Sequence, residues 1–181
     1  MAFFGKHIID EITASLCQVS ESGVDDVVDH ILEARRVFVA GLGRSGLMAR
    51  SLAMRLMHMG IAAHVVGDVT TPGINSGDLL IIASGSGETG SLVSMSNKAK
   101  DLGVKLVLFT TAKDSSIADL ADRIVLIPAQ TKHSDGGDSV QPMGSLFEQA
   151  LLIVFDEMVI RLCRIRYTEP AYMRSRHANL E

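Results

Sequence analysis

The sequence predicts an α/β protein built on a parallel sheet with helices on both faces. Five short apolar runs, rich in Val, Ile and Leu, alternate with segments whose apolar residues recur at helical spacing. Strands this apolar need cover on both faces, which favours a parallel sheet over a half-exposed antiparallel one. Two glycine-rich turns each join an apolar run to the helical segment after it, as expected for strand-to-helix connections in such a sheet.

The order of the elements follows from these patterns. Residues 6–34 indicate two helices, with Gly23 between them and with Ser22 and Asp25 available to cap the second. From residue 37 strands and helices alternate, and a long helix ends the series. The predicted strands are residues 37–40, 63–66, 78–83, 105–109 and 123–127, and the predicted helices are residues 45–59, the segment after Thr89, residues 115–121 and residues 145–165.

Two segments lack a regular pattern. Residues 129–145 are polar and rich in Gly, Ser and Asp, which predicts a loop long enough to act as a lid or as the edge of a site. The C-terminal tail, residues 167–181, is polar and has no clear periodicity. A chain of 181 residues has the length of one domain, so we expect residues 1–181 to form a single domain with a helical N-terminal segment.

The composition excludes several classes of function. A net charge of −4 with no Trp offers neither the basic surface nor the stacking side chains of a nucleic-acid-binding protein. The apolar stretch from Leu146 to Ile165 contains five charged residues, which predicts a core helix and not a membrane span. Cys17 and Cys163 are expected to be reduced thiols, since neither has metal-ligand or CxxC spacing. We therefore expect a cytoplasmic protein without a metal or a redox cofactor.

The first glycine-rich turn is the GLGRSG turn, residues 41–46. It matches the GxGxxG pattern of dinucleotide-binding proteins. An acidic residue, Asp68, follows at the end of the next predicted strand, where such proteins bind a ribose. A dinucleotide-dependent enzyme is therefore one hypothesis, although a single GxGxxG match is weak and the second turn favours another ligand.

The second is the SGSGET turn, residues 84–89. Three hydroxyls, those of Ser84, Ser86 and Thr89, surround two glycines at the expected beginning of a helix. Free backbone N–H groups and the positive end of the helix dipole attract an anion, and glycine lets the backbone approach it closely. The three oxygens of a terminal phosphate suit these donors. The structural alternative is that Ser84 and Ser86 only cap the helix and that Glu88 suits its first turn.

On these two turns the sequence resembles the SIS (sugar isomerase) domain family over residues 30–165. The terminal sequence RHANLE is similar to the ending of the 6-phospho-3-hexuloisomerase branch. The resemblance implies a flavodoxin-like five-stranded parallel sheet and a homotetramer that interconverts 3-hexulose 6-phosphate and fructose 6-phosphate. It also implies a pathway partner, hexulose-6-phosphate synthase, which joins formaldehyde to ribulose 5-phosphate. By the family pattern Ser45, Ser84, Ser86 and Thr89 would hold the phosphate, and Gly43, Arg44 and Gly85 complete the candidate phosphate site.

The implied reaction moves a carbonyl group between C3 and C2 through a cis-enediol, which one carboxylate above the C2–C3 bond can catalyse. The resemblance assigns this role to Glu148, which lies among apolar residues early in the helix 145–165. Its alternative role is structural, because Ser145-x-x-Glu148 is a capping box in which Glu148 would only close the helix start. His177 is the second catalytic candidate, since in an oligomer the tail of one chain can reach the pocket of another.

Other polar residues are weaker candidates. We expect His64 and His58 to pack in or beside the core and His133 to be solvated on its loop. Arg44 can neutralise a phosphate or pair with an acidic residue, and the sequence does not separate these roles. The position of Glu88 favours an acidic residue that stabilises the start of a helix over a catalytic residue.

Two other functions compatible with a phosphosugar site stay open at this point. One is an isomerase of a different sugar phosphate, such as arabinose 5-phosphate. The other is a non-catalytic phosphosugar sensor, although the first 35 residues are too few and too acidic for the DNA-binding module that such a sensor usually carries.

Overall fold

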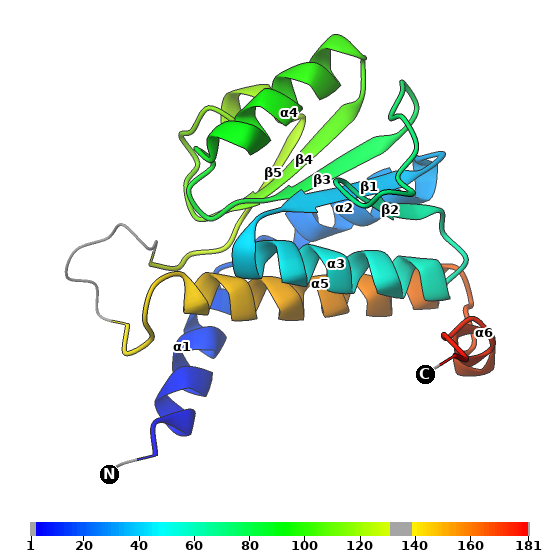
Figure 1. The fold of residues 1–181 in the computed structure, drawn as a ribbon. Coiled ribbons are helices and arrows are strands. Elements are labelled where there is room, and N and C mark those ends of the chain that lie inside the picture. The colour runs from blue at the N-terminus through cyan, green and yellow to red at the C-terminus, as the bar shows by residue number, and fades with distance from the viewer. Residues whose placement is uncertain (1–2, 131–138, 181) are drawn as a thin grey trace.

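The sheet confirms the predicted fold class. The computed structural model describes residues 3–130 and 139–180, so the prediction for His133 lies outside the described residues. Within those ranges, five parallel strands form one sheet in the order β2-β1-β3-β4-β5 (Figure 1), which is the flavodoxin-like order. The strands are β1 (Val37–Gly41), β2 (Ala63–Val65), β3 (Leu79–Ala83), β4 (Lys105–Thr110) and β5 (Arg123–Leu126).

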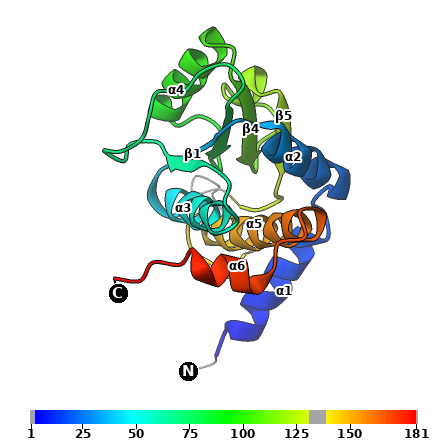
Figure 2. The same ribbon diagram turned by 90° about the vertical axis from the view of Figure 1, so that its right-hand side faces the viewer.

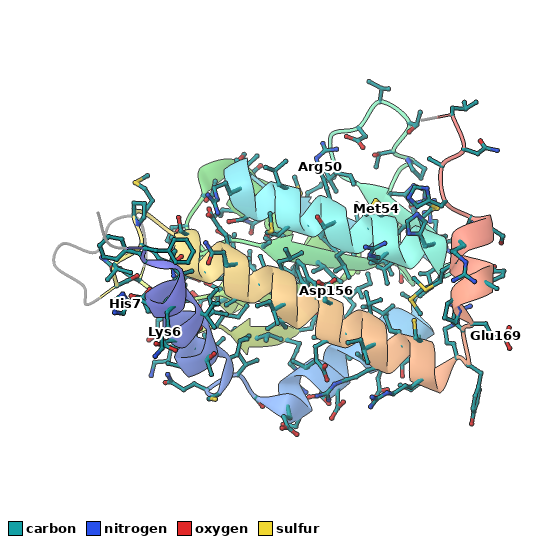
Figure 3. All side chains as sticks on the ribbon, turned by 90° about the horizontal axis from the view of Figure 1, so that it is seen from below. Lys6, His7, Arg50, Met54, Asp156 and Glu169 are labelled. Carbon is teal, nitrogen blue, oxygen red and sulfur yellow. The ribbon has the colours of Figure 1, made fainter. Side chains whose placement is uncertain are left out.

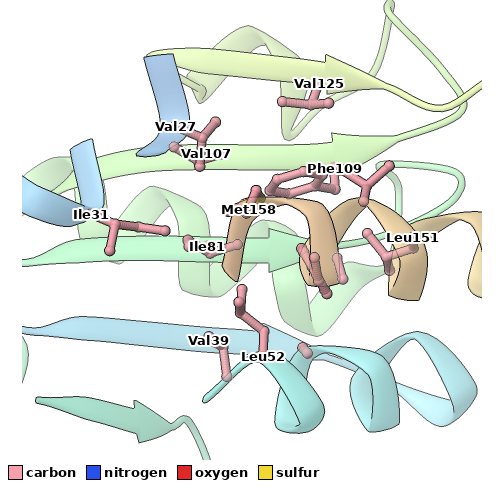
Figure 4. Close-up of a cluster of buried hydrophobic side chains, with 14 of the residues drawn as sticks. Val27, Ile31, Val39, Leu52, Ile81, Val107, Phe109, Val125, Leu151 and Met158 are labelled. Carbon is pink, nitrogen blue, oxygen red and sulfur yellow. The ribbon is translucent and has the colours of Figure 1, made fainter. Parts of the chain in front are cut away.

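Helices cover both faces of the sheet. Alternate residues of each strand point to opposite faces, and the strands are apolar on both, so both faces need cover. On β1, Val37 and Val39 pack with the helices below the sheet in Figure 1, while Phe38 and Ala40 pack with the helix above it. Figure 4 shows the larger of these two cores, where Leu151 and other residues meet the strands. The helices are α2 (Glu21–Glu33), α3 (Gly43–His58) and α5 (Ser145–Ile165) on one face, and α4 (Gly90–Asp101) with the 3-10 turn η1 (Ala118–Leu120) on the other.

Two further helices form an outer layer. Helix α1 (Gly5–Leu16) packs on the outside of α5, and the short helix α6 (Pro170–Ser175) packs against the end of α3 (Figures 2 and 3). The tail was expected to lack regular structure, yet Pro170 opens α6 at its first helical position, where proline is favoured. Six residues are too few for an apolar period to show in the sequence. No helix within the described ranges is long and apolar enough to span a membrane.

The N-terminal segment forms the two predicted helices, but the break lies earlier than Gly23. Helix α1 ends at Leu16 and α2 begins at Glu21. Ser20 caps α2, because its Oγ accepts a hydrogen bond from the backbone N–H of Gly23 at 3.1 Å. Gly23 therefore lies inside the first turn of α2, where its N–H needs a cap partner, and Ser22 is not the cap.

Asp78, the residue before β3, binds the residues just before β1. Its buried carboxylate accepts hydrogen bonds from Arg35 Nε at 3.1 Å, from Arg36 Nη2 at 2.6 Å and from the Asn75 backbone N–H at 2.9 Å. Burial by itself raises the pKa of Asp78, but the bonds from Arg36, Arg35 and Asn75 outweigh it and hold this pKa well below its usual range. The neighbouring strands β1 and β3 are therefore held together by one ionised group at their amino-terminal ends, opposite the strand-to-helix turns.

We expect the substitution Asp78→Asn to lower the free energy of unfolding by about 3 kcal/mol, because the buried amide loses the charge-assisted hydrogen bonds and its NH2 group faces donors. In the wild type this stabilisation is present above the unfolded-state pKa of about 3.9 and is lost as pH falls through the lower folded-state pKa. Urea unfolding at pH 7 and at pH 3 measures both effects.

Asp68→Asn is the matched control, because it breaks the exposed pair between Asp68 and Arg50. It should cost less than about 1 kcal/mol. Equal losses in the two variants would show that burial of Asp78 adds nothing to its ion pairs.

Candidate active site

A cavity of about 540 Å³ lies at the topological switch point of the sheet, beyond the carboxyl ends of the neighbouring strands β1 and β3. The connections leave these two neighbouring strands toward opposite faces, and such switch points are where open parallel sheets bind ligands. Both glycine-rich turns reach this cavity, and so does the beginning of α5. Its described lining includes all seven phosphate candidates and the proposed base: Gly43, Arg44, Ser45, Ser84, Gly85, Ser86, Thr89 and Glu148.

The GLGRSG turn brings the start of α3 directly onto the end of β1. A side chain on Gly46 would place its Cβ only 2.5 Å from the carbonyl oxygen of Gly41, so this close approach requires glycine. Gly43 has a φ of +56°, in the left-handed region that also favours glycine. Arg44 and Ser45 consequently occupy the first turn of α3, next to the backbone N–H groups that the helix leaves free.

The acidic residue that supported the dinucleotide hypothesis is engaged elsewhere. Asp68 accepts hydrogen bonds from Arg50 Nη2 at 2.7 Å and from Arg50 Nη1 at 3.3 Å. Neither residue is among those described as lining the cavity. The glycines of the GLGRSG turn therefore have a packing role that needs no dinucleotide.

The serines of the SGSGET turn hold the turn itself and do not cap α4. Ser84 is buried, and its Oγ accepts a hydrogen bond from the Gly87 backbone N–H at 3.2 Å. Ser86 Oγ accepts one from the Glu88 backbone N–H, also at 3.2 Å. A serine hydroxyl that accepts a hydrogen bond still has its own O–H to donate. The N-cap of α4 is Thr89, whose side chain makes no capping bond and lines the cavity instead.

The segment 110–117, which is the last residue of β4 and the loop that follows it, binds acceptor groups of the SGSGET turn. The carbonyl oxygen of Gly85 accepts from the Thr111 backbone N–H at 3.0 Å, from Thr111 Oγ1 at 2.8 Å and from Thr110 Oγ1 at 3.0 Å. The carbonyl oxygen of Gly87 accepts from the Ile117 backbone N–H at 3.2 Å. These acceptors are thus engaged by this segment, which leaves the cavity side of the turn rich in donors.

Glu88 is fastened to the same segment. Its carboxylate accepts from the Ser116 backbone N–H at 2.6 Å and from Ser116 Oγ at 2.7 Å. These side-chain and backbone hydrogen bonds lower the pKa of Glu88. Glu88 is not among the described residues that line the cavity, so its charge is tied down outside the place where an anion would sit.

Glu148 faces Arg44 across the join between α3 and α5. Glu148 Oε2 lies 2.6 Å from Arg44 Nε, and the Glu148 side chain is largely buried while that of Arg44 is more than half exposed. The capping box, the alternative role for Glu148, does not form, because the N-cap of α5 is Gly144 and Ser145 is already helical. The Glu148 carboxylate pairs with Arg44, whereas in a capping box it would accept a hydrogen bond from the backbone at the helix start. Among the described lining residues, this pair supplies both the acidic and the basic side chain.

Apolar side chains and two loops complete the cavity. One loop belongs to residues 129–145, which the sequence predicts as a lid or as the edge of a site, but no individual residue of either loop was named as a candidate. Phe147 packs against Gly85, where a Cβ would lie 3.4 Å from its ring. Thr111 follows the end of β4, a position that the sheet topology makes a candidate site once the strand order is known. The others come together only through tertiary packing, for which the sequence has no local signal. The missed lining residues include Leu42, Leu92, Thr111, Gln130, Pro142, Met143, Gly144 and Phe147.

His177 lies at the opposite end of α3 from the cavity. Its ring stacks on that of His58, with the centroids 5.2 Å apart, and the neighbouring Arg176 donates from Nε to the backbone carbonyl of Met57 at 2.9 Å. The 14 residue steps from Arg44 to His58 cover about 21 Å along the helix axis. A catalytic role for His177 therefore requires the cavity of another copy, and it stays a prediction.

His58 and His64 have packing contacts. His58 is buried, more deeply than the core-edge position expected for it, and this burial lowers its pKa. His64 on β2 lies with its ring centroid 5.1 Å from that of Phe38. In the part of the chain that the structure describes, no three His, Cys, Asp or Glu side chains gather as a metal site would require.

A flavodoxin-like sheet with two donor-rich turns at its switch point defines an α/β protein equipped to bind an anionic ligand. This chain belongs to the SIS domain family, whose model matches residues 30–154. The resemblance seen in the two turns is thereby confirmed.

Named relatives extend the similarity along almost the whole chain. A protein of Bacillus subtilis named 3-hexulose-6-phosphate isomerase is 46% identical over 176 residues, which are 96% of this chain and 95% of that protein. A protein of the same name from Mycobacterium gastri is 46% identical over 173 residues, 95% of this chain and 87% of that protein. A crystal structure from Methanococcus jannaschii, described as inferring the function of a 3-hexulose-6-phosphate isomerase, superposes with a TM-score of 0.85 at 29% identity. The superposition covers 96% of this chain and 98% of the Methanococcus jannaschii chain.

Proposed function

We propose that this protein is an isomerase that interconverts 3-hexulose 6-phosphate and fructose 6-phosphate. The observation that carries the proposal is the cavity in which a donor-rich turn and a largely buried carboxylate, that of Glu148, face the same space. The full-length similarity to proteins named for this reaction supports the choice of substrate.

In this proposal the phosphate occupies the side of the cavity formed by the two turns. Ser45, Ser84, Ser86 and Thr89 donate hydrogen bonds to its oxygens, since each of these residues lines the cavity. The N-termini of α3 and α4 add the positive ends of two helix dipoles. Gly43 and Gly85 let the backbone approach the phosphate closely.

Glu148 acts at the other end of the substrate. Its carboxylate removes the proton from C3 of fructose 6-phosphate, and the electron pair moves into a C2–C3 enediol as the C2 oxygen takes up a proton. Return of the proton to C2, with loss of the C3 hydroxyl proton and formation of a carbonyl group at C3, gives 3-hexulose 6-phosphate; the proton lost from the C3 hydroxyl balances the one gained by the C2 oxygen. One base suffices because the proton leaves and returns on the same face of the planar cis-enediol. The apolar wall that includes Phe147 and Leu92 limits competing water.

Arg44 links the two ends of the site. Before substrate binds, its guanidinium holds the Glu148 carboxylate in an ion pair, so this carboxylate is not free to approach a carbon of the substrate. The arriving phosphate carries more negative charge than one carboxylate and competes for this exposed, flexible arginine. Arg44 therefore exchanges Glu148 for the phosphate, and the base becomes free only when substrate is present.

The finer features that the resemblance implies belong to the same proposal. We infer a homotetramer in the cytoplasm, in which His177 of one copy reaches the cavity of another as a second acid or base. Hexulose-6-phosphate synthase, which makes 3-hexulose 6-phosphate from formaldehyde and ribulose 5-phosphate, is the inferred pathway partner.

Proton exchange tests the reaction directly. Incubation with fructose 6-phosphate in deuterated water should place deuterium on C3 and generate 3-hexulose 6-phosphate, both visible by NMR. Absence of exchange and of product would refute the isomerase. If fructose 6-phosphate then still bound tightly, the protein would be a sensor, and if only arabinose 5-phosphate exchanged, it would be an isomerase of that sugar.

A further inference from the structure

Glu11, on the outer helix α1, binds the segment that leads into the cavity. Its carboxylate accepts hydrogen bonds from Ser139 Oγ at 2.8 Å, from the Val140 backbone N–H at 2.7 Å and from Gln141 Nε2 at 2.9 Å. Glu11 itself is not among the described residues that line the candidate active site. Three bonds to one carboxylate, across about 130 residues of sequence, fix this segment against α1.

A second contact of α1 holds the chain where it leaves the sheet. Ser15, one helical turn after Glu11 and almost fully buried, donates from Oγ to the backbone carbonyl of Pro128 at 2.7 Å. Helix α1 therefore fastens the chain both shortly after β5 and again at residues 139–141. Gln130, close to the first of these contacts, lines the candidate active site and also a smaller cavity of about 270 Å³ beside α1.

The segment fastened by Glu11 continues without interruption into the active-site rim, residues 142–144. These three residues line the cavity. Met143 has a φ of +60°, which costs a residue with a side chain about 1 kcal/mol or more and persists only where its surroundings impose it. The rim then passes into α5, where the backbone N–H of Glu148 donates to the carbonyl oxygen of Gly144 at 3.1 Å. Figure 3 shows α1 crossing the beginning of α5 at this end of the molecule.

We propose that Glu11 is a positioning residue for the reaction: it fixes the rim 142–144 against α1 and thereby sets where Glu148 stands in the cavity. The proposal rests on the proposed function, since it gives Glu148 the role of base. It assigns α1, which lies outside the sheet and its two helical layers, a part in catalysis.

The Glu11 carboxylate is charged when it makes these contacts. Burial by itself raises its pKa, but the hydrogen bonds from Gln141, Val140 and Ser139, with the nearby charge of His7, outweigh burial and lower it. An uncharged amide of the same size cannot replace it, because its NH2 group would face one of these donors.

The substitution Glu11→Gln tests this role, with Asp10→Asn as the matched control. Asp10 precedes Glu11 on the same helix and is exposed, so its variant loses the same charge without touching the rim. We expect Glu11→Gln to lower kcat about tenfold. Inhibition by inorganic phosphate should change less than twofold, because the phosphate turns belong to β1, β3, α3 and α4. Asp10→Asn should leave both quantities unchanged.

Hydrogen exchange gives a readout that needs no turnover. The hydrogen-bonded backbone amides of Val140, Gln141 and Ser145 should exchange at least tenfold faster in Glu11→Gln, while those of the central strands keep their protection. Unchanged exchange at these amides, or faster exchange with an unchanged kcat, would overturn the proposal, and so would a parallel loss of kcat and phosphate inhibition. Failure of the proposed function looks different, because the wild type itself would then be inactive.

Discussion

The substitution Glu148→Gln should abolish turnover while leaving phosphate binding intact. We expect kcat to fall about 10³-fold, because the amide cannot accept a proton from carbon, and general-base catalysis typically contributes a factor of this size. Inhibition by inorganic phosphate should be at least as strong as in the wild type, since Arg44 no longer has a carboxylate partner. Steady-state kinetics with fructose 6-phosphate, together with phosphate inhibition, measures both effects.

The Glu148→Gln variant also decides whether Glu148 has a catalytic role or only forms the ion pair with Arg44. Because Arg44 is more than half exposed, loss of its pair with Glu148 should change the free energy of unfolding by less than about 1 kcal/mol. Glu157→Gln is the matched control, since Glu157 forms the pair with Arg161 on the same helix. A Glu148→Gln enzyme as active as this control would reduce Glu148 to a structural role.

Gly46→Ala should give the second large effect, on stability and on the site together. The new Cβ would lie 2.5 Å from the carbonyl oxygen of Gly41 and 2.8 Å from its carbonyl carbon, both backbone atoms that cannot turn aside. Helix α3 must therefore move off β1, at a cost of about 3 kcal/mol. That movement carries Arg44 and Ser45 away from the SGSGET turn, so phosphate affinity should fall as well.

Gly90→Ala provides the comparison for this prediction. A Cβ on Gly90, the first residue of α4, would have no heavy atom within 4 Å in the described structure. The variant should be neutral or stabilised by less than about 1 kcal/mol. Urea unfolding of both variants measures the difference. A Gly46→Ala protein as stable as the wild type would mean that β1 and α3 can separate freely, contrary to the contact described above.

The fold could be predicted from the sequence because its signals are local. The strands β1 to β5 are short apolar runs whose ends agree with the predicted ends within one residue, and α5 has its predicted bounds. The earlier break before α2 depended on which side chain accepts from the Gly23 N–H: the sequence analysis named Ser22 and Asp25, whereas the acceptor is Ser20. Helix α6 was missed because it is held by contacts with the end of α3.

The candidate site was predictable where a motif supplies it. The two turns could be placed because strand ends and glycines mark them, and topology then brings them together. The pair of Arg44 and Glu148 joins residues about 100 positions apart, so no local pattern separated it from the capping box. Thr111, Gln130 and the rim 142–144 come from other loops, and their arrival at the cavity depends on how α5 and α1 pack.

The engagement of the SGSGET carbonyls by the segment 110–117 has a consequence for the protonation state of the ligand. Three acceptors of this turn, the carbonyl oxygens of Gly85 and Gly87 and the Glu88 carboxylate, have partners in the segment 110–117. A fully ionised phosphate ester presents only acceptors and can accept from every O–H and free N–H of this turn, whereas the singly protonated form uses one oxygen as a donor and carries less charge, so it forms fewer charge-assisted hydrogen bonds. Since phosphate monoesters lose their second proton near pH 6, the ionisation of the substrate itself should set the acid limit of binding.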